Sequence, residues 1–117
     1  DSGRINYQKK SEEKLKFMFK NCCTNDYLTL LNGKLYRCPF SANTMNLKAI
    51  PILQNEFIDL SKNYSKDELK KDMINLYYKP EYLTACNYCN GRDFTTPRIE
   101  TAIQAEKPIP YIEHKNT

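Results

Sequence analysis

The chain has 117 residues, of which 40% are hydrophobic and 27% are charged, so it has the size and composition of one small globular domain and is not intrinsically disordered. No stretch approaches the eighteen or more apolar residues of a transmembrane helix, and the start lacks the basic and apolar leader of a signal peptide. We therefore expect a cytoplasmic protein that has no membrane partner. Because the first residue is Asp1 and not Met, we also expect a piece of a longer chain.

The net charge of +4 is mild, and it is concentrated partly in the first twenty residues, which hold five lysines. A solvated helix face explains such a cluster better than a phosphate-binding surface does, so nucleic acid is not an expected partner. The nine tyrosines do not change this expectation, because Tyr serves packing as well as base stacking.

The first predicted element is a helix that begins after Ser11, a residue that can cap a helix whose first turn holds Glu12 and Glu13. The polar run at 24–26 ends it. Apolar residues at spacings of three and four fall on one face of this helix: Leu15, Met18, Phe19 and Cys22.

The next element is a β-hairpin, in which residues 27–31 and 34–38 flank Asn32-Gly33. This pair favours a type I′ turn, and a two-residue loop pairs Leu31 with Lys34. One face of the hairpin is expected to point to the core and carries Leu28, Leu30 and Leu35. The other face carries Tyr27, Thr29, Tyr36 and Cys38.

Beyond the hairpin, Pro39 ends the strand, residues 40–56 are expected to form a loop around the body, and residues 57–60 a short strand. Ser65 and Glu68 have the spacing of a capping box and predict a second helix over 66–78, which Pro80 closes. The apolar stripe of this helix comprises Leu69, Met73, Leu76 and Tyr77. Near the end, a short helix is expected from Arg98 to Ala105 after Pro97, followed by an extended tail that holds the only histidine, His114.

Five cysteines are the most informative residues: Cys22, Cys23, Cys38, Cys86 and Cys89. An odd count without a leader argues against a disulfide framework. Cys86 and Cys89 form a Cys-x-x-Cys knuckle followed by Gly91, and Cys23 and Cys38 bracket the hairpin. Because an extended chain would carry Cys23 about 13 Å from Tyr27, the polar segment 24–26 must turn back for all four sulfurs to meet. Four such thiolates can hold a zinc ion or a 4Fe–4S cluster.

Simpler roles for these cysteines remain open. Cys22 has the spacing of a buried helix residue, Cys38 could be a buried strand residue, and Cys86 and Cys89 could form a redox pair. A structural zinc site is the strongest rival, although zinc modules usually use two short-spaced knuckles and this chain has one.

The cysteines and one glycine have a recognisable spacing. Nine residues separate Cys23 from Gly33, four separate Gly33 from Cys38, and a long gap follows before Cys86 and Cys89. It resembles the Twitch domain, the shorter relative of the SPASM domain, which carries an auxiliary cluster at the C-terminus of many radical S-adenosylmethionine (radical SAM) enzymes. The resemblance covers roughly residues 22–95. In that family a hairpin, a helix and later cysteines surround one 4Fe–4S site.

The resemblance implies that Cys23, Cys38, Cys86 and Cys89 are the cluster ligands, with Cys22 as the substitute for Cys23, and it implies no catalytic residue. Residues 1–21 would be the end of a preceding barrel domain and its helix, 22–95 the auxiliary iron–sulfur domain, and 96–117 a C-terminal tail. The three-cysteine loop of the radical SAM barrel is absent from this chain. S-adenosylmethionine and a second 4Fe–4S cluster would therefore belong to the missing barrel, and the chain alone is not expected to be catalytic.

The resemblance further implies that the cluster accepts or relays an electron from a substrate radical. Its partners would be the barrel of the parent chain and a reductant such as flavodoxin or ferredoxin. Arg37 and Arg92 lie beside ligand cysteines, where a cation would stabilise the reduced cluster, or they are surface salt-bridge residues.

The alternative from a different class is a zinc-stabilised binding module with four cysteine ligands and no redox activity, whose basic N-terminal helix contacts an acidic partner. A hydrolase is disfavoured, since one histidine and no carboxylate pair or Ser-His-Asp signature are present. The predicted fold is α+β, a small domain with an N-terminal helix, a β-hairpin, a second helix and a Cys-x-x-Cys knuckle around a metal cluster.

Overall fold

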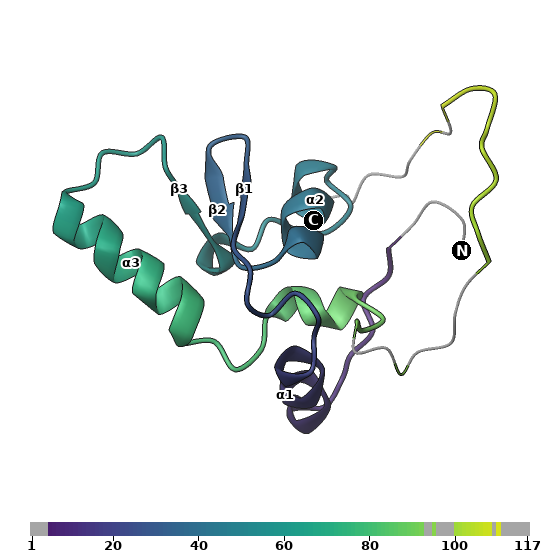
Figure 1. Ribbon diagram of the computed structural model, residues 1–117, viewed down its shortest axis with the longest axis horizontal. Coiled ribbons are helices and arrows are strands. Elements are labelled where there is room, and N and C mark those ends of the chain that lie inside the picture. Colours follow the sequence, from purple (N-terminus) through teal and green to yellow (C-terminus); the bar gives the residue numbers. More distant parts are fainter. Residues whose placement is uncertain (1–4, 93–94, 96–99, 109, 111–117) are drawn as a thin grey trace.

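The computed structural model describes residues 5–92, 95, 100–108 and 110, and these residues form a small α+β domain. A three-stranded antiparallel sheet with the order β1-β2-β3 lies between the helices (Figure 1). The α-helices and strands in chain order are α1 Glu12–Lys20, β1 Thr29–Leu31, β2 Lys34–Tyr36, α2 Pro39–Asn46, β3 Phe57–Asp59 and α3 Lys66–Tyr78. Two short 3₁₀ helices complete it, η1 Gln54–Glu56 and η2 Thr84–Tyr88. In the described part of the chain, no helix combines the length and apolar character that crossing a bilayer requires.

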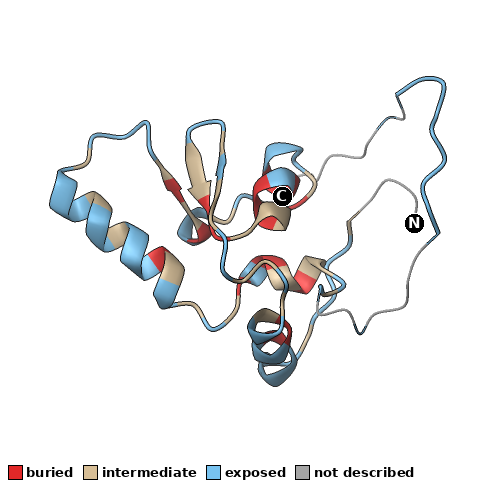
Figure 2. Ribbon diagram, viewed as in Figure 1, coloured by how far each residue is buried: buried red, intermediate tan, exposed pale blue. Residues whose placement is uncertain are grey.

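Both helices predicted from capping signals are confirmed. The Ser11 side chain accepts a hydrogen bond from the backbone N–H of Lys14 at the start of α1, at 3.2 Å. In α3 the capping box is complete, because Ser65 Oγ accepts from the Glu68 N–H and the Glu68 carboxylate accepts from the Ser65 N–H. Of the predicted stripe of α3, only Leu76 is buried, while Leu69 and Tyr77 are half-buried and Met73 is exposed. Figure 2 shows that most of the surface of α3 is exposed.

The hairpin turn and its register are also confirmed. Asn32 and Gly33 both have positive φ, 50° and 75°, as a type I′ turn requires. Leu31 pairs with Lys34, and the short strand expected at 57–60 exists as β3, which pairs antiparallel with β2.

The predicted core face of the hairpin is wrong. Leu30 is 65% exposed, whereas Tyr36, expected on the outer face, is 4% exposed and lies in the core. The reason is that α2 packs on the Tyr36 face, so that Tyr36 shares a core cluster with Ala42 and Met45 of that helix.

The segment expected to be a loop over 40–56 instead begins with α2 and ends with η1. Pro39 has two roles here: it ends the strand because it lacks an N–H, and it occupies the first turn of α2, where that N–H would have no helical partner. Cys38 is the N-cap of the same helix. The core thus forms where α2 meets the sheet and η2, and its buried members are Tyr36, Ala42, Met45, Ile50, Leu83 and Ala85.

The C-terminal expectations are only partly covered by the structure. Residues 100–105 contain no helix, so the short helix predicted from Arg98 to Ala105 is wrong over the residues that are described. Pro97, Arg98 and His114 lie outside the described residues.

Candidate metal centre

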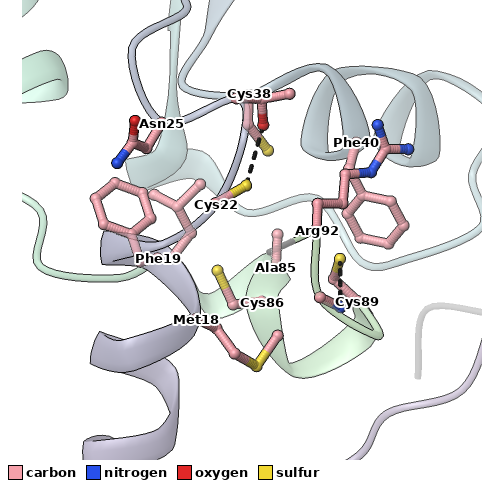
Figure 3. Close-up of a pocket in the computed structure, with 13 residues that line it drawn as sticks. Met18, Phe19, Cys22, Asn25, Cys38, Phe40, Ala85, Cys86, Cys89 and Arg92 are labelled. Carbon is pink, nitrogen blue, oxygen red and sulfur yellow. Dashed lines mark hydrogen bonds between the residues drawn. The ribbon is translucent and has the colours of Figure 1, made fainter. Parts of the chain in front are cut away.

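Four cysteines from three separate parts of the sequence line one small cavity: Cys22, Cys38, Cys86 and Cys89. Figure 3 shows the sulfurs of Cys22 and Cys38 facing those of Cys86 and Cys89 across this space. The cavity has a volume of about 40 Å³, which admits a small inorganic group and is too small for an organic substrate. Much of the remaining wall is apolar and consists of Met18, Phe19, Phe40, Leu83 and Ala85.

The two adjacent cysteines at the end of α1 have different environments. Cys22 lines the cavity and its sulfur lies 3.2 Å from Thr24 Oγ1, whereas Cys23 is exposed and does not line the cavity. The chain does turn back after them, as expected, since the Asn25 N–H donates to Cys22 O at 3.2 Å. The backbone N–H of Cys23 donates to Arg92 O at 2.9 Å and so links this turn to the segment after the knuckle. The fold therefore brings Cys22, and not Cys23, to the other three thiols.

Cys38 reaches the cavity from the N-terminus of α2. Its sulfur accepts a hydrogen bond from the backbone N–H of Ser41 at 3.3 Å, the bond that an N-cap side chain makes. Burial raises the pKa of this thiol, the hydrogen bond from Ser41 opposes that shift, and the charges of Cys22 and Cys89 add to it. An external positive charge or a metal is therefore needed to hold Cys38 as a thiolate at neutral pH.

The Cys-x-x-Cys segment forms a tight turn at the end of η2. The Cys89 N–H donates to Cys86 O at 3.3 Å, and the Gly91 N–H donates to the Cys89 sulfur, also at 3.3 Å. Gly91 has a φ of 97°, which a side chain would strain, so the glycine after the second cysteine is what permits this bond. Burial raises the pKa of Cys86 to about 12, and the charges of Cys38 and Cys89 contribute to the rise.

Two charged side chains anchor this turn from other parts of the chain. The carboxylate of Glu56, which is 9% exposed, accepts from the backbone N–H groups of Thr84 and Ala85 at 2.7 and 3.1 Å and so caps η2. The ammonium of Lys10 donates to the carbonyl oxygens of Cys86 and Cys89, at 2.9 Å in each case. Burial lowers the pKa of Lys10, and the neighbouring Cys89 opposes that shift. Sequence reasoning identified neither residue, because the partners lie 28 or more positions away.

The segment before α1 also contacts the knuckle. The Gln8 N–H donates to Asn87 O at 2.8 Å, and the rings of Tyr7 and Tyr88 meet edge to face with centroids 5.4 Å apart. The described part of the segment assigned to a preceding domain therefore contributes to the walls and anchors of this centre.

The two arginines beside the cysteines differ from each other. Arg37 is 4% exposed, so its interpretation as a surface salt-bridge residue is wrong, because α1 and α3 cover it with Phe19 and Tyr77. Arg92 is exposed, and it contributes to the rim of the cavity.

Comparison with protein families, curated proteins and solved structures found no match to the chain. The donor set must therefore be judged by its chemistry. Within the described residues, no three cysteine, histidine or carboxylate side chains lie close enough together to hold one metal ion. A single zinc ion would need all four sulfurs at about 2.3 Å from one point, whereas a 4Fe–4S cluster binds each thiolate at a different iron and keeps them apart. In the described residues the four thiols line one largely apolar cavity and do not form a preformed single-ion site.

Proposed function

We propose that this chain is the auxiliary 4Fe–4S domain of a radical SAM enzyme, with Cys22, Cys38, Cys86 and Cys89 as its four ligands. The single observation that carries the proposal is the meeting of these four thiols, from three distant segments, on one small cavity. All five cysteines of the chain are free of disulfides, so their sulfurs are available as ligands.

The chain's own groups suit a buried anionic sulfur centre. The backbone N–H groups of Ser41 and Gly91 donate to the sulfurs of Cys38 and Cys89, and such bonds stabilise negative charge on sulfur. Apolar side chains form much of the cavity wall. When bound, a cluster of this kind exchanges single electrons at a potential that depends on hydrogen bonds to sulfur and on burial.

Four cysteine ligands leave no iron open to a substrate, which favours electron transfer over direct binding of substrate. The electron would come from a substrate radical, or from a reductant such as flavodoxin or ferredoxin. S-adenosylmethionine, the second cluster and the catalytic residues would belong to the barrel of the parent chain.

The proposal departs from the residue assignment implied by family spacing, which favours Cys23. Cys23 is exposed, and a ligand in that position would need the turn over residues 23–26 to be rebuilt. Cys22 needs no such change, since its sulfur already lines the cavity.

Anaerobic reconstitution with iron and sulfide tests the proposal. We expect about four iron and four sulfide per chain, with a broad brown absorption that is lost on reduction. A colourless protein that retains one zinc ion per chain after purification would instead establish the zinc-stabilised binding module and refute the proposal.

A matched pair of variants tests the ligand assignment. Cys22→Ala should abolish cluster loading, whereas Cys23→Ala should load iron and sulfide as the unmodified chain does. The same side chain is removed one position apart, so a general effect of losing a thiol is controlled. Loss of the cluster in Cys23→Ala alone would restore the assignment based on family spacing.

A further inference from the structure

Arg37 is a buried cation whose hydrogen bonds all go to neutral groups. Its guanidinium donates to three backbone carbonyl oxygens, from Nε to Tyr77 at 3.2 Å, from Nη1 to Tyr27 at 3.1 Å and from Nη2 to Asn25 at 2.5 Å. It also lies over the rings of Phe19 and Tyr77, at 5.0 and 4.7 Å from their centroids. The side chain is therefore fixed in place without a carboxylate partner.

A charge in this position is costly unless an opposite charge lies nearby. Among the described residues, both salt bridges involve Lys16 and neither involves Arg37. Burial lowers the pKa of Arg37, and four groups oppose that shift: Tyr77, Cys38, Asp26 and Cys22.

Two residues that hold the guanidinium also line the cavity: Phe19, whose ring lies under it, and Asn25, whose carbonyl oxygen accepts from Nη2. Cys38, the next residue along the chain, and Cys22 line the same cavity. The buried cation therefore lies next to the cavity wall that carries the thiols.

We infer that Arg37 is the buried counter-charge of the thiolate centre and a positioning residue that raises its reduction potential. This inference rests on the proposed function. A reduced cluster carries one more negative charge than an oxidised one, so a fixed cation that solvent does not screen stabilises the reduced form more. The same guanidinium joins the turn after Cys22 to the end of α3, and so it holds one ligand in place as well.

Three substitutions at this position separate charge from structure. Arg37→Lys keeps the charge but loses the planar set of donors, while Arg37→Met removes both. Arg37→Gln removes the charge but keeps an amide that can donate to the carbonyl oxygens. The matched control is Lys20→Met, which changes the net charge equally, two residues from Cys22, but at an exposed site.

The measurement is a reductive titration of the full chain after cluster loading. We expect both neutral variants at position 37 to lower the equilibrium constant for one-electron reduction of the cluster about tenfold. This corresponds to a shift of the reduction potential by about 59 mV to more negative values. Arg37→Lys and Lys20→Met should stay close to the unmodified chain. A structural role alone would lower the stability of all three Arg37 variants and leave the potential unshifted.

The outcomes separate this inference from the proposed function. If the unmodified chain loads no iron–sulfur cluster, the proposed function fails and the inference fails with it. If the chain loads a cluster and the neutral variants have the unmodified potential, only the inference fails. If neither neutral variant folds and the reduction potential of Arg37→Lys differs from that of the unmodified chain, Arg37 is a structural residue and the inference is again overturned.

Discussion

Replacing Glu56 by Gln tests how the Cys-x-x-Cys turn is held in the metal-free protein. The Glu56 carboxylate is 9% exposed and accepts two backbone N–H bonds at the start of η2, from Thr84 and Ala85. Gln has almost the same shape but only one acceptor oxygen. Its amide group would therefore present a donor to one of the two N–H groups, and that bond would be lost.

The expected cost follows from these contacts. A hydrogen bond to a charged acceptor contributes about 1.5–3 kcal/mol, and a buried N–H left without a partner adds its own penalty. The remaining bond also weakens when its acceptor becomes neutral. We therefore expect Glu56→Gln to lower the free energy of unfolding by about 2–4 kcal/mol, which corresponds to a fall in Tm of roughly 10 °C or more for a domain of this size.

Urea unfolding of the metal-free protein, followed by circular dichroism, measures this cost. Glu81→Gln is the matched control, because Glu81 forms an exposed ion pair with Lys16 at 3.0 Å and its side chain is 70% exposed. Such a pair contributes about 0–1 kcal/mol. The reasoning is refuted if Glu56→Gln lies within about 0.5 kcal/mol of the unmodified chain, or if the two variants lose equal stability.

Two further predictions concern alkaline pH and the hydrophobic core. The pKa of Cys86 is about 12 in the folded protein and near 8.5 in an unfolded chain, so the metal-free protein should lose up to about 1.4 kcal/mol of stability per pH unit as the pH rises between these values. Urea midpoints from about pH 8 to 11 should fall less steeply in Cys86→Ser, and an unchanged slope would disprove this. Ile50→Ala should cost about 2–5 kcal/mol, since Ile50 is 1% exposed, while Leu30→Ala should stay within about 0.5 kcal/mol. Thermal unfolding of the two variants compares these costs. A large loss of stability in Leu30→Ala would show that the Leu30 face of the hairpin packs in the core.

Elements set by local hydrogen bonds could be predicted from the sequence. The capping box of Ser65 and Glu68 places α3 at the expected residues, and Asn32-Gly33 sets the hairpin turn and register. In each case the signal and the bond it makes lie within four residues of one another.

The hairpin face could not be predicted in the same way, because it depends on a distant partner. Both faces of the hairpin carry large apolar side chains, and the choice between Leu30 and Tyr36 is made by α2. The sequence does not predict that helix, since its N-cap is Cys38, a residue that seldom caps helices, and Pro39 after a strand indicates the end of that strand. One missed helix therefore accounts for both errors.

Cys22, the cavity cysteine that follows α1, shows that helical periodicity and family spacing can favour different residues. Cys22 continues the apolar stripe of Met18 and Phe19 at spacings of four and three, and this spacing predicts a buried helix residue. That same periodicity directs it toward the side of the chain where Met18 and Phe19 line the cavity. Burial and ligation are therefore compatible for this residue, because the cavity is the place where the buried face of α1 ends. Cys23 has a helical spacing to Phe19 alone, since it stands five positions after Met18, and it is exposed. Helical phase relative to both residues therefore distinguishes the two neighbours better than their distance from Gly33 does.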